Sequence, residues 1–157
     1  MSAQEKSAKP LAVNRKVRHD YFVIESYEAG IELRGTEVKS IRDGHISLAG
    51  GFARVENGQI FLRNVNIAAY EFGNQFNHDP IRTRRLLFHK KEVYRLQSQT
   101  ELKGHTLIPL AVYLKRGLVK VEVGLCKGKQ HQDKRETLRR KTADMEAARA
   151  VSRARKR

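Results

Sequence analysis

The sequence has very little cysteine and no long apolar stretch. Its one cysteine, Cys126, cannot form a disulfide within the chain, which fits a reducing compartment. No segment approaches the ~20 apolar residues that a membrane-spanning helix needs. The N-terminal residues MSAQEKSAKPLAV also lack the apolar core of a secretory signal. We therefore expect a cytoplasmic protein with no membrane partner, in which residues 1–13 form a flexible N-terminal arm.

Acidic residues are scarce as well: 17 Asp and Glu stand against 32 Lys and Arg, which gives a formal net charge of +15. The excess is uneven, since residues 1–126 carry 20 basic and 13 acidic residues (+7), whereas residues 127–157 carry 12 and 4 (+8). A chain this basic favours phosphate backbones or anionic membrane surfaces. Without a spanning segment we favour nucleic acid, and acidic lipid is the weaker alternative.

The sequence contains no recognisable set of ligands for a metal or a nucleotide. A zinc site normally needs four close ligands, and the histidines show neither HxxxH nor paired-cysteine spacing; they are His19, His45, His78, His89, His105 and His131. Neither GxxxxGK[ST] nor GxGxxG occurs. We therefore expect no metal and no cofactor.

Catalysis is the weaker hypothesis for this chain. A nuclease would use a carboxylate with a histidine as general acid and base. Nothing in the spacing of the candidate carboxylates distinguishes them from surface partners of the many cations; the candidates are Glu28, Glu37, Asp43 and Asp79. We expect a protein that is not an enzyme.

Alternating apolar and polar residues predict a mainly β domain over residues 14–126. Strands are predicted at 20–27 (resuming at 31–33), at 52–56, at 59–67, and in the segments TLIPLAVYLKRG and LVKVEVGLCKG. Helices are predicted at 36–44 and 89–104, and RTRRLLFH is either a short strand or the lead-in to the second helix. Such strands must close on themselves to bury their faces. We expect a small closed antiparallel barrel of the oligonucleotide-binding (OB) type with two or three packed helices.

Turn and cap residues set the expected boundaries. Asn57-Gly58 supplies the two positive φ angles of a tight hairpin turn. Thr36 is a candidate N-cap and Gly44 a helix stop, while Ala29-Gly30 indicates a bulge or bend. Pro109 suggests an edge position or a bulge. The segment YEFGNQFNHDP is expected to be a loop in which the Asp carboxylate accepts local backbone N–H bonds.

Residues 127–157 form a basic tail that lacks the means to fold alone. Leu138, Met145 and Val151 are its only sizeable apolar residues, too few to offset roughly 1–2 kcal/mol of backbone entropy per residue. Its composition nevertheless favours helix from Lys134 onward. We expect a tail that is disordered when free and helical against a polyanion.

Three clusters of basic residues in the domain point to RNA. They are Asn14-Arg15-Lys16 with Arg18 and His19, Arg82-Thr83-Arg84-Arg85 with Lys90 and Lys91, and Lys115-Arg116 with Lys120. Any one cluster is as readily a solvated face, but three on one chain favour phosphate contacts. Glu28, within this field, either accepts from a base edge or a 2′-hydroxyl or forms a plain ion pair.

The ordered motifs resemble the SsrA-binding protein (small protein B) family of bacteria. The resemblance runs from residue 14 to about 136 and is carried by NRKVRHDYFVIE, EAGIEL, GTEVKSIRDG, FNHDP, RTRRLL, HKKEV, TLIPL, VYLK, GLVKVEVGLCKGK and DKRE. It implies an OB-type barrel that binds the tRNA-like domain of transfer-messenger RNA. It also implies a role in trans-translation, in which the ribosome and, through the charged RNA, elongation factor Tu are partners. The tail would occupy the decoding centre and the empty mRNA channel, and we expect a monomer.

The resemblance also implies site residues. For RNA binding they are Asn14, His19, Glu28, Leu87 and Lys120, to which the first basic cluster adds Arg15 and Lys16. For the ribosome they are Asp133, Lys134 and Arg135, with Lys127, Gly128 and Lys129 at the junction that leads into the tail and His131 and Gln132 just before DKR. The family usually has an aromatic or His directly before DKR, whereas this chain has Gln132 there and His131 one residue earlier. Either His131 supplies the stacking or Gln132 substitutes a hydrogen bond. A general single-strand-binding OB protein is the alternative function, disfavoured by only eleven aromatic residues.

Overall fold

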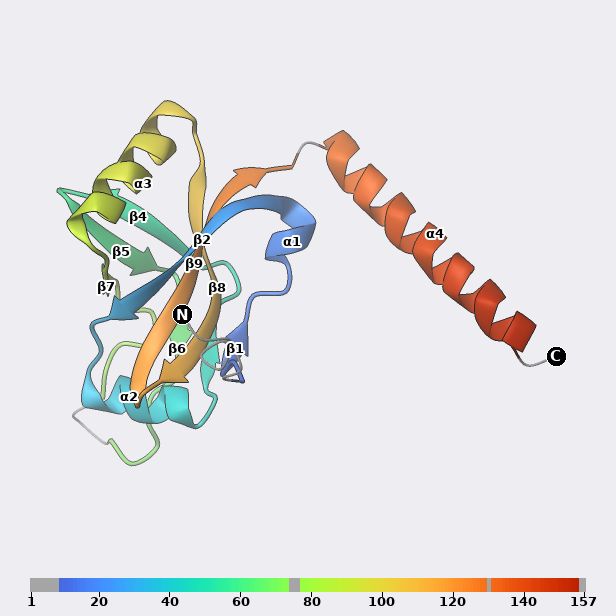
Figure 1. The fold of residues 1–157 in the computed structure, drawn as a ribbon. Helices are drawn as coiled ribbons and strands as arrows, with labels where there is room; N and C mark the ends of the chain where they lie inside the picture. The colour runs from blue at the N-terminus through green and yellow to red at the C-terminus, as the bar shows by residue number, and fades with distance from the viewer. Residues whose placement is uncertain (1–8, 74–76, 130, 156–157) are drawn as a thin grey trace.

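The computed structural model describes residues 9–73, 77–129 and 131–155, and for 131–137 and 153–155 it describes the backbone alone. The elements are β1 Ala12–Val13, α1 Val17–Asp20, β2 Tyr21–Ile31, α2 Gly35–Arg42, β3 Ile46–Ser47, β4 Phe52–Glu56, β5 Gln59–Arg63, β6 Asn66–Ile67, β7 Arg84–Leu87, α3 Lys90–Leu102, β8 Thr106–Lys115, β9 Leu118–Gly128 and α4 His131–Arg155. Figure 1 shows strands curving around one core, with α2 and α3 at opposite ends and α4 projecting away.

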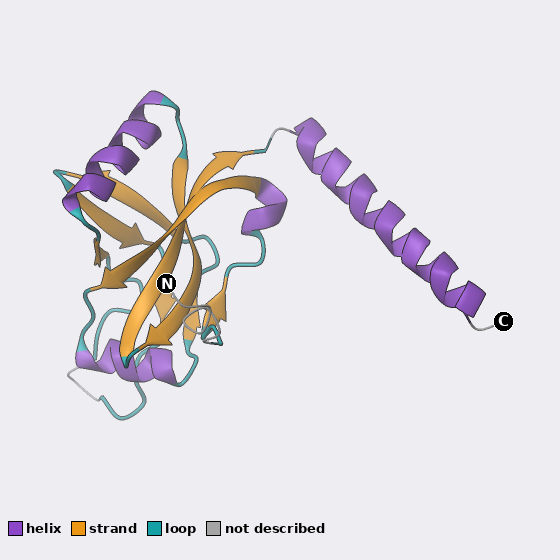
Figure 2. Ribbon diagram, viewed as in Figure 1, coloured by secondary structure: helices purple, strands orange, loops and turns teal. Residues whose placement is uncertain are grey.

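All strand pairs in the described part of the chain are antiparallel. The main sheet has the order β1-β8-β4-β5-β7-β2-β9, and β9 pairs a second time with β8. Six strands, from β8 through β4, β5, β7, β2 and β9, therefore form a continuous circuit of pairings (Figure 2). The short strands β3 and β6 pair separately. The predicted mainly β architecture is confirmed.

Alternation along the strands places the core as predicted. In β9, Val119, Val121, Val123 and Leu125 are at most 9% exposed and belong to one cluster of buried residues. Val93 and Leu96 of α3 join the same cluster, which packs that helix against the sheet. Burying apolar area in this way is the main favourable term in folding, worth about 25 cal/mol per Å².

The β4–β5 hairpin is confirmed, with φ angles of 50° at Asn57 and 74° at Gly58. Its second strand is shorter than the predicted 59–67, because β5 ends at Arg63 and Asn64 has a φ of 60°. This turn redirects the chain, and residues 66–67 pair with β3 instead. Residues 84–87 of RTRRLLFH form a strand, which decides between the two alternatives for that segment.

The strand register shows no bulge at Ala29-Gly30. The register between β2 and β9 shifts between Val23 and Glu25, while Gly30 pairs regularly with Lys120. Three consecutive apolar residues, 22–24, stand exposed around this shift, and strict alternation is lost there. Pro109 does lie at a bulge, between residues 109 and 111 of β8, where its missing N–H is tolerated.

The predicted N-cap of α2 is also wrong, because the helix begins one residue earlier, at Gly35. The Thr36 hydroxyl lies 2.8 Å from Nδ1 of His78 instead, and His78 Nε2 lies 2.8 Å from the Ile67 carbonyl. Since a carbonyl only accepts, Nε2 donates and Nδ1 accepts from Thr36. This buried histidine therefore ties the loop after β6 to α2. The stop at Gly44 (φ 80°) is confirmed.

Strand pairing extends beyond residues 14–126 at both ends. Ala12 and Val13, assigned to the arm, pair with Val112 and Ala111 of β8. Residues 127–128, assigned to the tail, are the last of β9 and pair with β2. Every described side chain of α4, from 138 to 152, is exposed. At 1.5 Å per residue, this helix is about 37 Å long.

Candidate nucleic-acid interface

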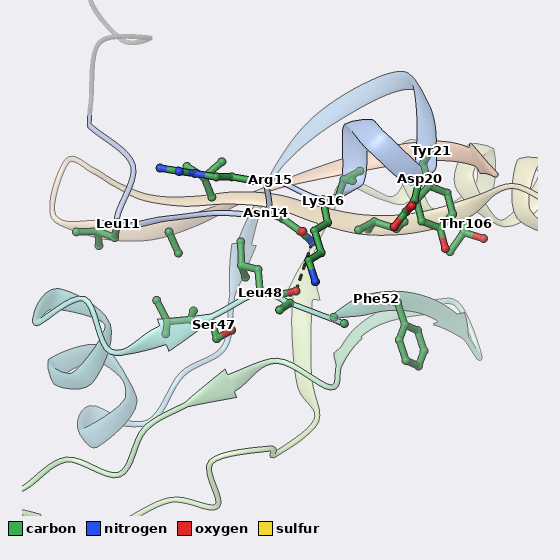
Figure 3. Close-up of a pocket in the computed structure, with 18 residues that line it drawn as sticks. Leu11, Asn14, Arg15, Lys16, Asp20, Tyr21, Ser47, Leu48, Phe52 and Thr106 are labelled. Carbon is green, nitrogen blue, oxygen red and sulfur yellow. Dashed lines mark hydrogen bonds between the residues drawn. The ribbon is translucent and has the colours of Figure 1, made fainter. Parts of the chain in front are cut away.

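Three residues of the first predicted cluster, but not Arg18 or His19, line a cleft of about 890 Å³ between the N-terminal segment and the loop that precedes β4. Asn14, Arg15 and Lys16 lie on one wall and residues 47–52 on the other (Figure 3). Lys16 reaches into the space between the walls, whereas the Arg15 side chain runs back along β1. We call this the N-terminal cleft. His19 is half-buried on α1 and is not among the residues that line it.

Asn14 holds the cleft together. Its side-chain amide donates to the Pro109 carbonyl at 3.1 Å and to the Leu48 carbonyl at 3.3 Å, and its backbone N–H donates to the Leu110 carbonyl at 2.8 Å. Both amide hydrogens therefore have partners within the protein. Asn14 positions the exposed Arg15 and Lys16 at the mouth of the cleft.

The strand register brings together three more predicted residues. Leu87 of β7 pairs with Gly30 of β2, and Gly30 also pairs with Lys120 of β9. Paired residues in antiparallel strands point to the same face, and Glu28, two residues before Gly30, points there as well. We call this surface the Gly30 face: Leu87, Gly30, Glu28 and Lys120. Gly30 has no side chain, so the centre of the Gly30 face is open. A Cβ at this position would lie 3.3 Å from Leu87 Cβ.

Charges on the Gly30 face are close together and partly buried. Glu28 accepts from Lys115 Nζ at 3.2 Å, and both side chains are about a quarter exposed. Burial, followed by the charges of Glu28 and Glu122 and a hydrogen bond with Glu28, raises the pKa of Tyr113 to about 12. The phenol therefore stays protonated at neutral pH and can donate a hydrogen bond.

A groove of about 570 Å³ adjoins this face, bounded by Glu28, Lys120, the start of α3 and the turn between β8 and β9. The turn places Arg116 at a φ of 54°, followed by Gly117 at 77°. Positive φ at both residues is what a two-residue hairpin turn requires, and this turn places Arg116 among the residues that line the groove. The sequence indicated Gly30 only as part of a bulge or bend and gave no role to Tyr113, because the placement of both residues depends on cross-strand register.

The two candidate surfaces lie near opposite ends of β2. Seven residues separate Tyr21, which lines the N-terminal cleft, from Glu28 of the Gly30 face, about 23 Å at 3.3 Å per residue. A single small ligand does not span this distance, whereas a folded RNA or two separate RNA segments do.

In the second predicted basic cluster the arginines are paired with carboxylates of the protein itself. Arg84 is fully buried and ion-paired to Glu37, which is also fully buried, and Arg82 Nη2 lies 2.6 Å from the same carboxylate. Arg85 pairs with Glu32 at 2.7 Å. Arg84 is thereby removed from solvent, whereas the Arg85 side chain is 38% exposed and Lys90 and Lys91 are exposed at the start of α3. Burial therefore excludes Arg84 alone from contact with phosphate.

The predicted ribosome-binding residues lie at the junction with α4 and in its first turns. Lys127 and Gly128 end β9, and Lys129 follows directly. His131, Gln132, Asp133, Lys134 and Arg135 belong to α4 by their backbone, and their side chains lie outside the described part of the structure. Whether His131 or Gln132 takes the role of the aromatic or His that the family usually has before DKR therefore stays open.

Among the described residues no three His, Cys, Asp or Glu side chains group in a way that could hold a metal ion. No helix within the described ranges is long and apolar enough to cross a membrane.

Comparison with known proteins gives consistent matches over nearly the whole chain. The family model described as "SmpB protein" matches residues 11–153. The SsrA-binding protein of Geobacillus thermodenitrificans (strain NG80-2) is 53% identical over 142 residues, covering 90% of this chain and 92% of the relative. The SsrA-binding protein of Bacillus subtilis (strain 168) is 53% identical over 144 residues, covering 92% of each.

A solved structure is also similar. A chain from the structure described as "tmRNA-SmpB: a journey to the center of the bacterial ribosome" superimposes with a TM-score of 0.65 at 50% identity, covering 82% of this chain and 94% of that one. A family match over most of the sequence, with about half of the residues identical to these relatives, shows that the chain belongs to the SmpB family of SsrA-binding proteins.

Proposed function

We propose that the protein binds the tRNA-like domain of transfer-messenger RNA and delivers it to stalled ribosomes for trans-translation, in the cytoplasm and as a monomer. The observation that carries this is the Gly30 face, where the register brings Glu28, Leu87 and Lys120 into one row. Family membership supports the choice of RNA, since the relatives are named for binding SsrA and the solved neighbour is described with tmRNA and the ribosome.

In this proposal the circuit of six strands acts as an OB-type barrel that presents its RNA-binding side chains on a rigid sheet. Lys120 and Lys115 neutralise phosphate, Leu87 gives an apolar contact for a base or ribose, and Glu28 accepts from a base edge or a 2′-hydroxyl. Elongation factor Tu joins only through the charged RNA.

The tail would then serve the ribosome. Its excess of eight positive charges suits a channel lined by RNA, and α4 makes its backbone hydrogen bonds internally along a path of about 37 Å. With all described side chains exposed, α4 gains little from tertiary packing. We expect it to be partly disordered in the free protein and completed as a helix in the decoding centre and the downstream mRNA channel.

The test is a binding competition over a salt series, using the tRNA-like domain of transfer-messenger RNA, an ordinary elongator tRNA and a random single strand. Full-length protein and a variant ending at Lys129 are compared. We expect strong preference for the first RNA, retained without the tail. Equal binding to all three RNAs, lost with the tail, would contradict the proposal and favour a general single-strand binder.

Replacing Glu28 by Ala is expected to weaken binding to the tRNA-like domain about tenfold or more, because a charge-assisted hydrogen bond contributes about 1.5–3 kcal/mol. The direction of this change in affinity distinguishes a specific contact from general electrostatic attraction. A purely electrostatic surface would bind RNA more tightly after losing a negative charge. Glu122→Ala, which removes the carboxylate paired opposite Glu28, is the matched control. If Glu28→Ala bound as tightly as Glu122→Ala, or more tightly, Glu28 would have no specific role.

A further inference from the structure

Lys129, the last described residue before α4, makes three contacts with the domain among the residues that the structure describes. Its backbone N–H donates to the Asp20 carbonyl at 2.9 Å, and its ammonium donates to the Arg18 carbonyl, also at 2.9 Å. The same ammonium lies 4.8 Å from the centre of the Phe22 ring. Side chain and backbone thus both hold this residue against α1 and the start of β2.

The partners suit a cation. α1 has only four residues, so the Arg18 carbonyl lies among its terminal acceptors, which have no N–H partner within the helix. Lysine commonly satisfies such carbonyls at a helix C-terminus. The face of an aromatic ring also attracts an ammonium, by about 0.5–1 kcal/mol at an exposed site. Phe22 is 44% exposed on β2, so the face of its ring is accessible to the ammonium group.

The position along the chain gives these contacts a consequence. α4 begins at residue 131, so the domain is held to within two residues of the helix. α1 and α4 approach to within 8 Å between Cα atoms, and Figure 1 shows α1 beside the end of β9 where the chain leaves for α4. Because α4 is about 37 Å long, a small change of angle at its first residue displaces its far end by a large distance.

We propose that Lys129, the Phe22 ring and the Arg18 carbonyl form a clamp that sets the direction in which the tail leaves the domain. Lys129 and Phe22 are then positioning residues. They act by holding α4 at one angle to a domain docked on its RNA. Val17 and Asp20 of α1 and its N-cap residue Lys16 also line the N-terminal cleft, so the clamp and that cleft share this helix.

The clamp is tested in the free full-length protein by the distance distribution between two spin labels, one at Lys103→Cys and one at Ala147→Cys. Both sites are exposed, whereas Cys126 is buried, and burial raises the pKa of its thiol to about 11, which disfavours labelling there. Because part of the tail is expected to be disordered in the free protein, we expect one main distance, from molecules in which the clamp is closed and α4 is formed, above a broad background. Phe22→Leu should lower the ratio of that population to the others about two- to fivefold, while Phe22→Tyr should preserve it. Lys129→Met should act like Phe22→Leu, and Lys129→Arg should restore the distribution.

Phe72→Leu is the matched control, because it makes the same change at another exposed phenylalanine, on the loop after β6. An unchanged distribution in both Phe22→Leu and Lys129→Met would overturn the clamp. This measurement involves no RNA and stands independently of the proposed function.

The consequence for the ribosome rests on the proposed function and is measured separately. Phe22→Leu should lower the rate of tagging of stalled nascent chains and leave affinity for the tRNA-like domain unchanged, with Phe22→Tyr rescuing tagging. Full tagging by a variant whose distance distribution has broadened would overturn the role of the clamp in delivery.

Discussion

Replacing Glu37 by Ala is expected to lower the free energy of unfolding by about 3–5 kcal/mol, the cost of leaving a buried charge without its partner. The Glu37 carboxylate and the Arg84 guanidinium it pairs with are both fully buried. Arg84 also donates to the Val65 carbonyl at 2.8 Å and the Pro80 carbonyl at 3.1 Å. Truncation would strand the cation between α2, β7 and the loop that precedes it. Urea unfolding followed by circular dichroism measures the change.

Glu32→Ala is the matched control for Glu37→Ala. It also removes a glutamate paired with an arginine of RTRR, but this pair is 54% exposed on the glutamate and 38% on the arginine. Exposed pairs contribute about 0–1 kcal/mol. Should Glu37→Ala not fold, Glu37→Gln retains hydrogen-bond acceptance without the charge and is expected to lose less. Equal losses in Glu37→Gln and Glu32→Ala would show that the buried pair contributes no more than a surface pair.

Because of the Glu37 carboxylate, we also expect the protein to lose stability in acid. Burial opposes ionisation of Glu37, but hydrogen bonds from Arg82, the Arg34 backbone N–H and Arg84 outweigh it and lower the pKa from its ordinary value of 4.5. A group with a lowered pKa in the folded state stabilises the protein above its unfolded pKa, and this contribution is lost as the pH falls through the folded pKa. The unfolding free energy of the parent should therefore fall below pH 4.5 more steeply than that of Glu37→Gln. Parallel curves would contradict this assignment.

Local sequence patterns predicted the parts of the fold that neighbouring residues determine. Asn57-Gly58 specified a hairpin because its turn requires two positive φ angles, and the alternation of Val119, Val121 and Val123 specified a strand with one buried face. The helix over 90–102 followed from its spacing and its glycine stop. Each of these depends on residues within about one element of each other.

Features that depend on distant partners were not predictable in this way. Arg84 and Glu37 lie 47 residues apart, and a cation in the sequence looks the same whether it faces phosphate or a buried carboxylate. Thr36 was a sound N-cap by type, but His78, 42 residues away, takes its hydroxyl. The Gly30 face was predictable in part. The resemblance identified Glu28, Leu87 and Lys120 as site residues, but only the register of three strands placed them in one row.

Replacing Asp133, Lys134 and Arg135 together by Ala is expected to lower tagging of stalled nascent chains by about 10²-fold or more, given that two charge-assisted contacts contribute about 1.5–3 kcal/mol each. Affinity for the tRNA-like domain should be unchanged, because the Gly30 face and the N-terminal cleft both lie on the β domain. Purified ribosomes stalled on a message without a stop codon, supplied with charged transfer-messenger RNA, give the tagging rate, and a filter assay gives the affinity.

The chain offers a close control for that variant. The same three residue types, one Asp, one Lys and one Arg, occur farther along α4 as the exposed residues Arg140, Lys141 and Asp144. Alanine at these positions changes net charge and helix propensity in the same way. If the decoding centre recognises residues 133–135 individually, this second variant should lose tagging far less than the first. Normal tagging by the first variant would refute the proposed role of residues 133–135. Equal losses of tagging in the two variants would mean that the tail acts through its total charge, because a helix that only fills an RNA channel depends on the number of its cations and not on their positions.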